Sequence, residues 1–197
     1  MEKYLRTNIE NEAALSLEIL SEQIPKVKID LYRWKWVILF LHNTLQNFMV
    51  LALRGTNNLK VVNKKDADKW LKAYYNNEDT LPVCRLDNFL NLYQKIKTNS
   101  MCQYVNSKKY IPNKDEDFYV KKLNQLRNDF IHFVPKSWSI QLVGLPGLCL
   151  DCLSIIQFLI FESGNIIFYN DLYDTASKYL NVSIRELEII RQIYNNK

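Results

Sequence analysis

Glycine and proline are scarce in this chain, and their scarcity limits the folds that it can adopt. Only four glycines and five prolines occur among 197 residues. A protein built mainly from β-strands needs many tight turns, which depend on these two residue types. Apolar residues make up 48% of the chain and aromatic residues 13%, which is enough for a full hydrophobic core. The composition therefore favours an all-α protein, and the length suits a single domain over residues 1–197.

Hydrophobic periodicity and helix-boundary residues divide the chain into successive helices. A long helix should end at Arg54, because Gly55 is a natural residue just past a helix end. Two short helices should complete the chain, and "SIRE" at 183–186 matches a capping box that opens the second. We expect an antiparallel helical bundle with these additional short C-terminal helices. Before these two, the expected helices cover residues 7–24, 30–54 (the long helix), 64–75, 85–97, 115–133 and 148–162.

Positive charge is concentrated in the middle of the chain. The net charge is +5. Residues 60–136 carry fifteen Lys and Arg against nine Asp and Glu, whereas residues 137–197 carry four against six. The ammonium and guanidinium groups of the middle section would attract a polyanion such as RNA. A solvated lysine-rich face would have the same composition.

The most apolar run, "WVILFLHNTLQNFMVLAL", is long enough to resemble a transmembrane helix. Polar residues fall in its centre, including His42 and Gln46, and hydrocarbon would penalise them heavily. A buried core helix is the better interpretation, so no membrane partner is expected. The N-terminus "MEKYLRTNIENEA" lacks the pattern of a signal peptide, which predicts a cytoplasmic protein with reduced thiols.

The four cysteines do not form a recognisable metal motif. Cys149 and Cys152 make one C-x-x-C within an apolar stretch, while Cys84 and Cys102 lie eighteen residues apart. A structural zinc site usually needs a second closely spaced ligand pair, so small buried core residues are the default interpretation. A Gly-rich phosphate loop and an H-E-x-x-H motif are also absent from the sequence. We therefore expect neither a metal nor a cofactor.

The helix expected over residues 115–133 has one apolar side and one polar side. Placed on a wheel at about 100° per residue, Leu123, Leu126, Phe130 and Phe133 gather into a core face. The opposite side carries Arg127, Ile131, Asn124, Asn128 and His132. Asn128 and His132 are four residues apart, so the amide can orient the imidazole. An isoleucine in the middle of a polar face makes sense if a second copy of the helix covers it.

The hexapeptide "RNDFIH" at 127–132 resembles the R-x(4–6)-H motif of the HEPN superfamily. These all-α domains are found in toxin–antitoxin, abortive-infection and CRISPR-associated ribonucleases. Asn128 fills the position after the arginine, where the family favours a polar residue. The resemblance covers residues 110–135 and, loosely, the helical bundle around them. It implies a metal-independent endoribonuclease in which the ribose 2′-hydroxyl attacks the adjacent phosphate.

The resemblance also implies roles for individual residues. His132 would act as general base or acid, and Arg127 would stabilise charge on the phosphorane. Asn128 would position one of these two side chains, and two copies of the motif would form one composite site in a homodimer. Flanking phosphates would be held by Lys121, Lys122 and Lys136. The biological setting would be a toxin or antiviral-defence effector that cleaves RNA, with an antitoxin or activating partner.

His42 is the other histidine of the chain, and its i+4 neighbour is Gln46. Buried polar groups must find hydrogen-bond partners. The pair could hold Arg127 or His132 in position, could hydrogen-bond to each other within the core, or could face a partner chain.

Two other functions are compatible with the sequence. A catalytically inactive HEPN-type module would bind RNA or a nucleotide, or would act as a scaffold. A plain interaction bundle would use Arg127 in a surface ion pair and His132 as a helix cap.

Overall fold

A computed structural model describes residues 3–132, 135, 137–169 and 171–196. Within these ranges the chain is helical and contains no β-strand, although one isolated antiparallel bridge joins Val62 and Leu86. The all-α helical bundle expected from the composition is confirmed. The α-helices are α1 Ile9–Gln23, α2 Trp34–Leu53, α3 Lys64–Tyr75, α4 Phe89–Ile96, α5 Glu116–Ile131, α6 Leu145–Phe161 and α7 Leu172–Asn195. Three 3-10 turns, Ile24–Lys28, Leu31–Arg33 and Asn99–Met101, lie between them.

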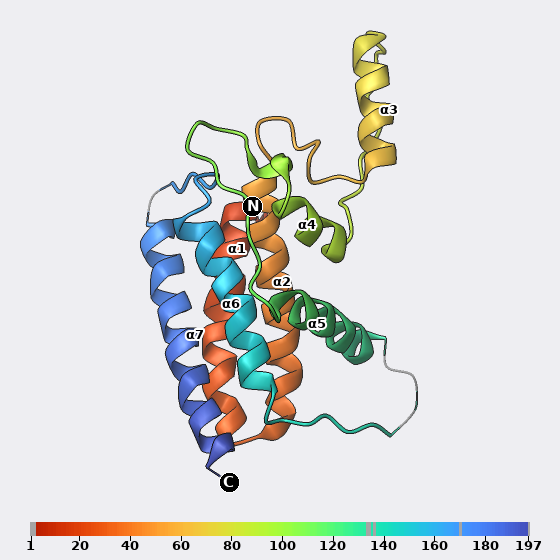
Figure 1. The fold of residues 1–197 in the computed structure, drawn as a ribbon. Helices are drawn as coiled ribbons and strands as arrows, with labels where there is room; N and C mark the ends of the chain where they lie inside the picture. Colours follow the sequence, from red (N-terminus) through yellow and green to blue (C-terminus); the bar gives the residue numbers. More distant parts are fainter. Residues whose placement is uncertain (1–2, 133–134, 136, 170, 197) are drawn as a thin grey trace.

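Four long helices, α1, α2, α6 and α7, lie side by side and form the bundle (Figure 1). α1 packs against α2 and α7, and α6 packs against the same two helices. α1 and α2 run in opposite directions, as do α6 and α7 (Figure 1). Each of these helices turns an apolar face inward, which is how amphipathic helices share one core.

α2 is the central helix of the bundle, and thirteen of its residues are buried. It ends as expected, with Arg54 as the C-cap and Gly55 at φ +55°, a conformation that glycine adopts without strain. The segment Leu31–Leu53 is long and apolar enough to cross a membrane, but 67% of its most apolar window is buried inside the protein. That burial is typical of a core helix.

α5 crosses the flank of the bundle and packs against α2, α4 and α6 (Figure 1). Its buried side chains include Leu123 and Leu126, so this part of the apolar stripe is confirmed. Phe130 is only half-buried and meets the ring of Trp138 edge-on, with ring centroids 5.0 Å apart. Phe133 lies outside the described residues.

The prediction of two short C-terminal helices was wrong. α7 is one continuous helix of 24 residues, Leu172–Asn195. Ser183 is not a cap, because it is buried and its Oγ donates a hydrogen bond of 2.8 Å to the carbonyl oxygen of Tyr179, one turn earlier. A serine can bond to the preceding turn in this way inside a helix. The "SIRE" pattern therefore lies within the helix.

Candidate functional site

The polar side of α5 faces α2 and α4, and the three helices enclose a pocket of about 440 Å³. α5 contributes three polar side chains, α2 contributes two, and the start of α4 provides the remaining wall. We name this the Arg127 pocket. Its lining residues are His42, Gln46, Asn88, Phe89, Leu90, Asn124, Arg127 and Asn128.

His42 forms the floor between α2 and α5. Only 5% of its surface is exposed, and its ring stacks on Phe89 with the centroids 3.9 Å apart. Its Nε2 lies 3.2 Å from Oδ1 of Asn124. Because a carbonyl oxygen can only accept a hydrogen bond, Nε2 carries the ring proton and donates a hydrogen bond to Oδ1 of Asn124. His42 therefore holds Asn124 in place and ties α2 to α5.

The surroundings of His42 keep it uncharged. Burial lowers the pKa of His42 from 6.5 to about 4; the hydrogen bond to Asn124 opposes this change, and the charge of Arg127 adds to it. The imidazole is therefore neutral at pH 7, and Arg127 remains the cation of the pocket.

Arg127 is half-buried and is oriented by the next residue of α5. Its Nη1 donates a hydrogen bond of 3.0 Å to Oδ1 of Asn128. Within the described part of the chain, no carboxylate lies within ion-pair distance of Arg127. The N-terminal end of α4 borders the same pocket, and a helix N-terminus carries partial positive charge. An unpaired guanidinium beside a helix N-terminus can bind an anion such as phosphate.

His132 is not among the residues that line the Arg127 pocket. It is the C-cap of α5 and follows the last residue of the helix. Its backbone N–H donates a hydrogen bond of 2.8 Å to the carbonyl oxygen of Asn128, and its side chain is exposed. Ile131 beside it is 48% exposed. One chain thus brings Arg127 and Asn128 together with His42 and Gln46, whereas His132 faces solvent at the end of the helix.

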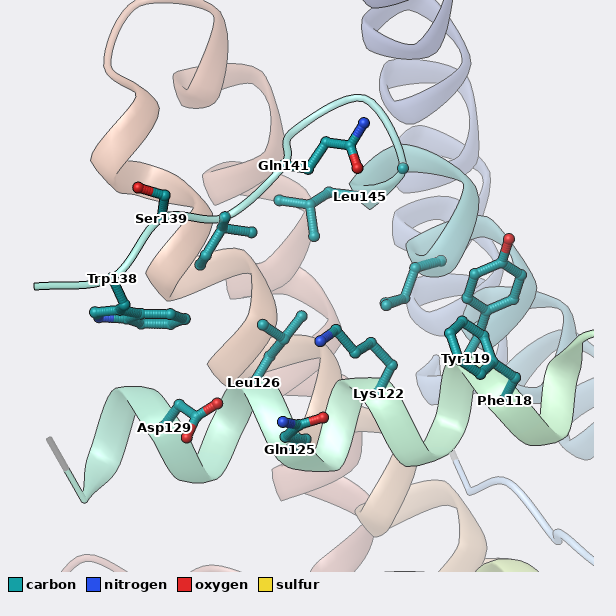
Figure 2. Close-up of a pocket in the computed structure, with 13 residues that line it drawn as sticks. Phe118, Tyr119, Lys122, Gln125, Leu126, Asp129, Trp138, Ser139, Gln141 and Leu145 are labelled. Carbon is teal, nitrogen blue, oxygen red and sulfur yellow. The ribbon is translucent and has the colours of Figure 1, made fainter. Parts of the chain in front are cut away.

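Two of the three lysines expected to hold flanking phosphates lie in the described part of α5, and neither lines the Arg127 pocket. Lys121 is exposed on α5. Lys122 lines a second pocket, between α5 and the segment 138–145, and Figure 2 shows its amino group reaching into that space. Lys136 lies outside the described residues.

The cysteines and acidic residues do not gather into a metal site within the ranges that the structure describes. Cys149 and Cys152 are fully buried in α6, as small core residues. Burial raises the pKa of the Cys149 thiol, which keeps it protonated. Cys84 is half-buried and Cys102 is exposed.

Two residues of this pocket have no site role in the sequence-based prediction. Asn124 was placed on the polar face of its helix, but its contact with His42 was not predicted. Asn88 was placed inside a helix, whereas it is the N-cap of α4, with Oδ1 accepting from the N–H of Asn91 at 2.9 Å. Asparagine is a favoured N-cap residue, and Asn88 stands directly before the apolar residues Phe89 and Leu90. That position could have located the cap.

Comparison with known proteins gives no family for the chain, since no family model, no curated protein and no solved structure matches it. The function proposed below therefore depends on the residues of the Arg127 pocket and on the resemblance of "RNDFIH" to the HEPN motif.

Proposed function

We propose that this protein is a metal-independent endoribonuclease of HEPN type that cleaves RNA at a composite site in a homodimer. The observation that carries the proposal is the unpaired Arg127, held by Asn128 in a pocket that also receives the N-terminus of α4. Such a pocket can hold a phosphate of RNA without contacting its bases. We further propose that the biological role is that of a toxin or antiviral-defence effector in the cytoplasm, kept in check or activated by a partner.

The reaction moves one proton onto the enzyme and one back to the RNA. A general base takes the proton of the ribose 2′-hydroxyl, the O2′–P bond forms, and the P–O5′ bond breaks. The leaving O5′ receives a proton from the general acid, so the products carry a 2′,3′-cyclic phosphate and a 5′-hydroxyl. His132 is the group proposed for proton transfer, because its imidazole is exposed and therefore accessible to a substrate.

Arg127 is proposed to stabilise the negative charge of the phosphorane. Its planar fork of donors matches two phosphate oxygens at once. Asn128 uses its Oδ1 to hold the guanidinium, which leaves its amide nitrogen available as a further donor. His42 is neutral and hydrogen-bonded to Asn124, so we assign it a positioning role rather than a proton-transfer role.

A second copy of the chain completes the proposed site. Since His132 lies outside the pocket of its own chain, the histidine that meets Arg127 comes from the partner across a two-fold axis. Ile131, which is 48% exposed beside His132, is the apolar residue that such a dimer would cover.

The test is cleavage of a short RNA in EDTA, with the product ends identified by mass. Wild-type protein should release 2′,3′-cyclic phosphate ends. Arg127→Ala and His132→Ala should each slow cleavage by about a hundredfold or more while folding is retained. Arg191→Ala is the matched control, because Arg191 pairs with Glu188 on α7 at 2.7 Å and should be dispensable. Products with 3′-hydroxyl ends, or cleavage unchanged by both substitutions, would reject this chemistry.

A second function is favoured by the position of His132 outside the Arg127 pocket. If no dimer brings a histidine to Arg127, the same pocket would bind RNA without cutting it. RNA would then be retained, with an affinity that falls steeply as salt is raised, and no strand scission would occur.

A further inference from the structure

A second pocket of about 440 Å³ lies on a different side of α5 from the Arg127 pocket. Its walls are α5, the start of α6 and the irregular segment that leads into α6 (Figure 2). Its volume is within the range of pockets that hold small molecules or single groups of larger ones. We name it the Trp138 pocket. None of the residues that line it belongs to the Arg127 pocket.

α5 presents a stripe of four side chains to the Trp138 pocket, with helical spacing i, i+3, i+4 and i+7. These are Lys122, Gln125, Leu126 and Asp129. A rise of about 1.5 Å per residue puts the backbone positions of Lys122 and Asp129 about 10 Å apart along the helix axis. The apolar Leu126 lies between them. The stripe therefore has a positive end, a middle made of one amide and one apolar side chain, and a negative end.

The two charged side chains of this stripe are available to a ligand. Within the described residues, neither Lys122 nor Asp129 has an ion-pair partner, and their side chains make no hydrogen bond. Both are half-buried. Partly burying opposite charges without a partner is costly, and a ligand with complementary groups would offset that cost.

Aromatic rings form the walls at both ends of the pocket. Figure 2 shows Trp138 beside Asp129, and Phe118 and Tyr119 beside Lys122. Trp138 is fixed by its edge-on contact with Phe130, at 5.0 Å between ring centroids. Proteins stack the bases of single-stranded RNA on aromatic rings that line a groove, and a nearby cation holds the backbone.

We propose that the Trp138 pocket binds one guanine nucleotide of a single-stranded RNA, with the base toward Asp129 and its phosphate at Lys122. Lys122 and Asp129 are attached to α5 about 10 Å apart, so a nucleotide, with a base at one end and a phosphate at the other, can contact both side chains. Asp129 can only accept hydrogen bonds, and guanine offers two adjacent N–H donors on its Watson–Crick edge. Uracil offers one N–H between two carbonyl oxygens, which a carboxylate repels.

This inference rests on the proposed function in taking RNA as the ligand, and it adds a preference for guanine near the scissile phosphate. Both pockets are built on α5, so one strand that crosses this helix could occupy the two together. The Arg127 pocket would then hold a phosphate without regard to sequence, and the Trp138 pocket would select the base.

Binding of two labelled RNA strands tests the proposal: a short oligouridine, and the same strand with one guanine. Fluorescence anisotropy should give the guanine strand an affinity about tenfold higher. Asp129→Ala should remove that preference, and Asp129→Asn should reduce it. Lys122→Ala should lower the affinity for both strands by about the same factor, because it removes a phosphate contact.

Matched controls come from α3, which stands apart from the bundle in Figure 1. Lys69→Ala and Asp68→Ala remove exposed charges of the same types and should leave the guanine preference unchanged. Equal affinity of wild-type protein for both strands, or a preference that survives Asp129→Ala in a folded variant, would overturn the inference. Arg127→Ala should keep the preference, so a protein that prefers guanine without cutting RNA would reject only the proposed cleavage.

Discussion

Protonation of His42 should control how the stability of this protein depends on pH. Only 5% of the histidine is exposed. Its ring stacks on Phe89 with the centroids 3.9 Å apart, and its Nε2 lies 3.2 Å from Oδ1 of Asn124. Burial lowers its pKa from 6.5 in the unfolded chain to about 4 in the folded protein. Above pH 6.5 neither state is protonated at this residue, so it contributes no pH dependence there. Below pH 6.5 the unfolded state takes up a proton that the folded state refuses, so stability falls.

The size of the effect follows from the two pKa values. The gap between 6.5 and about 4 corresponds to a loss of about 3 kcal/mol once the pH has fallen to the folded pKa. Most of that loss should be complete by about pH 4.5. A domain of this kind is stable by roughly 5–15 kcal/mol, so the loss is a large and measurable fraction.

Urea unfolding at several pH values between 7 and 4.5 measures this loss. His42→Gln keeps an amide donor for Asn124 but cannot titrate, so between pH 7 and 4.5 its stability should fall by about 2.5 kcal/mol less than that of the wild type. His132→Gln is the matched control, because its exposed side chain is hydrated in both states, and its curve should follow the wild type. Parallel curves for wild-type protein and His42→Gln would refute the reasoning.

Three further predictions concern Arg127, the continuity of α7 and the buried Glu116. Arg127→Ala should raise the pKa of His42, since the arginine charge helps to lower it; NMR titration of the imidazole would measure this, and an unchanged value would contradict their proximity. Ile184→Pro should cost about 3 kcal/mol or more in urea unfolding, because α7 is continuous there; a tolerated proline would contradict that continuity. Glu116→Ala should cost about 1–3 kcal/mol, because the backbone N–H of Asn113 loses its carboxylate acceptor and the Ser154 hydroxyl loses one of its two; thermal unfolding would check it, and Glu22→Ala, at an exposed glutamate on α1, should be neutral.

Local sequence signals were enough to locate several helices. The run "KKDADKWLKAYY" coincides with α3, Lys64–Tyr75, because Asn63 caps it and accepts a hydrogen bond from Asp66 N–H at 2.9 Å. Gly55 marked the end of α2 through its left-handed conformation. These boundaries depend on backbone chemistry within a few residues, which the sequence contains directly.

The error in α7 has a tertiary cause. "SIRE" is a strong local signal for a helix start, yet Ser183 is buried and bonds to the preceding turn of the same helix. The flanking Leu180 and Leu187 are fully buried, so packing against the bundle stabilises a continuous helix. Tertiary burial outweighed a capping preference of about 1 kcal/mol.

The candidate site could be predicted only in part. The wheel put Arg127 and Asn128 on one face of α5, and both do line one pocket. The sequence allows three roles for His42 and does not decide among them, because its partner Asn124 lies 82 residues away. The angle at which α5 crosses α2 decides that contact, and helical periodicity does not contain that angle.

The most direct test of the proposed composite site is RNA cleavage in EDTA by a mixture of two inactive variants, Arg127→Ala and His132→Ala. In a mixed dimer one chain supplies the arginine and the other supplies the histidine to the same pocket. The account predicts that each variant alone is inactive and that the mixture recovers activity, with 2′,3′-cyclic phosphate ends, as subunits exchange. Active wild-type protein together with an inactive, fully exchanged mixture would contradict a site shared between two chains.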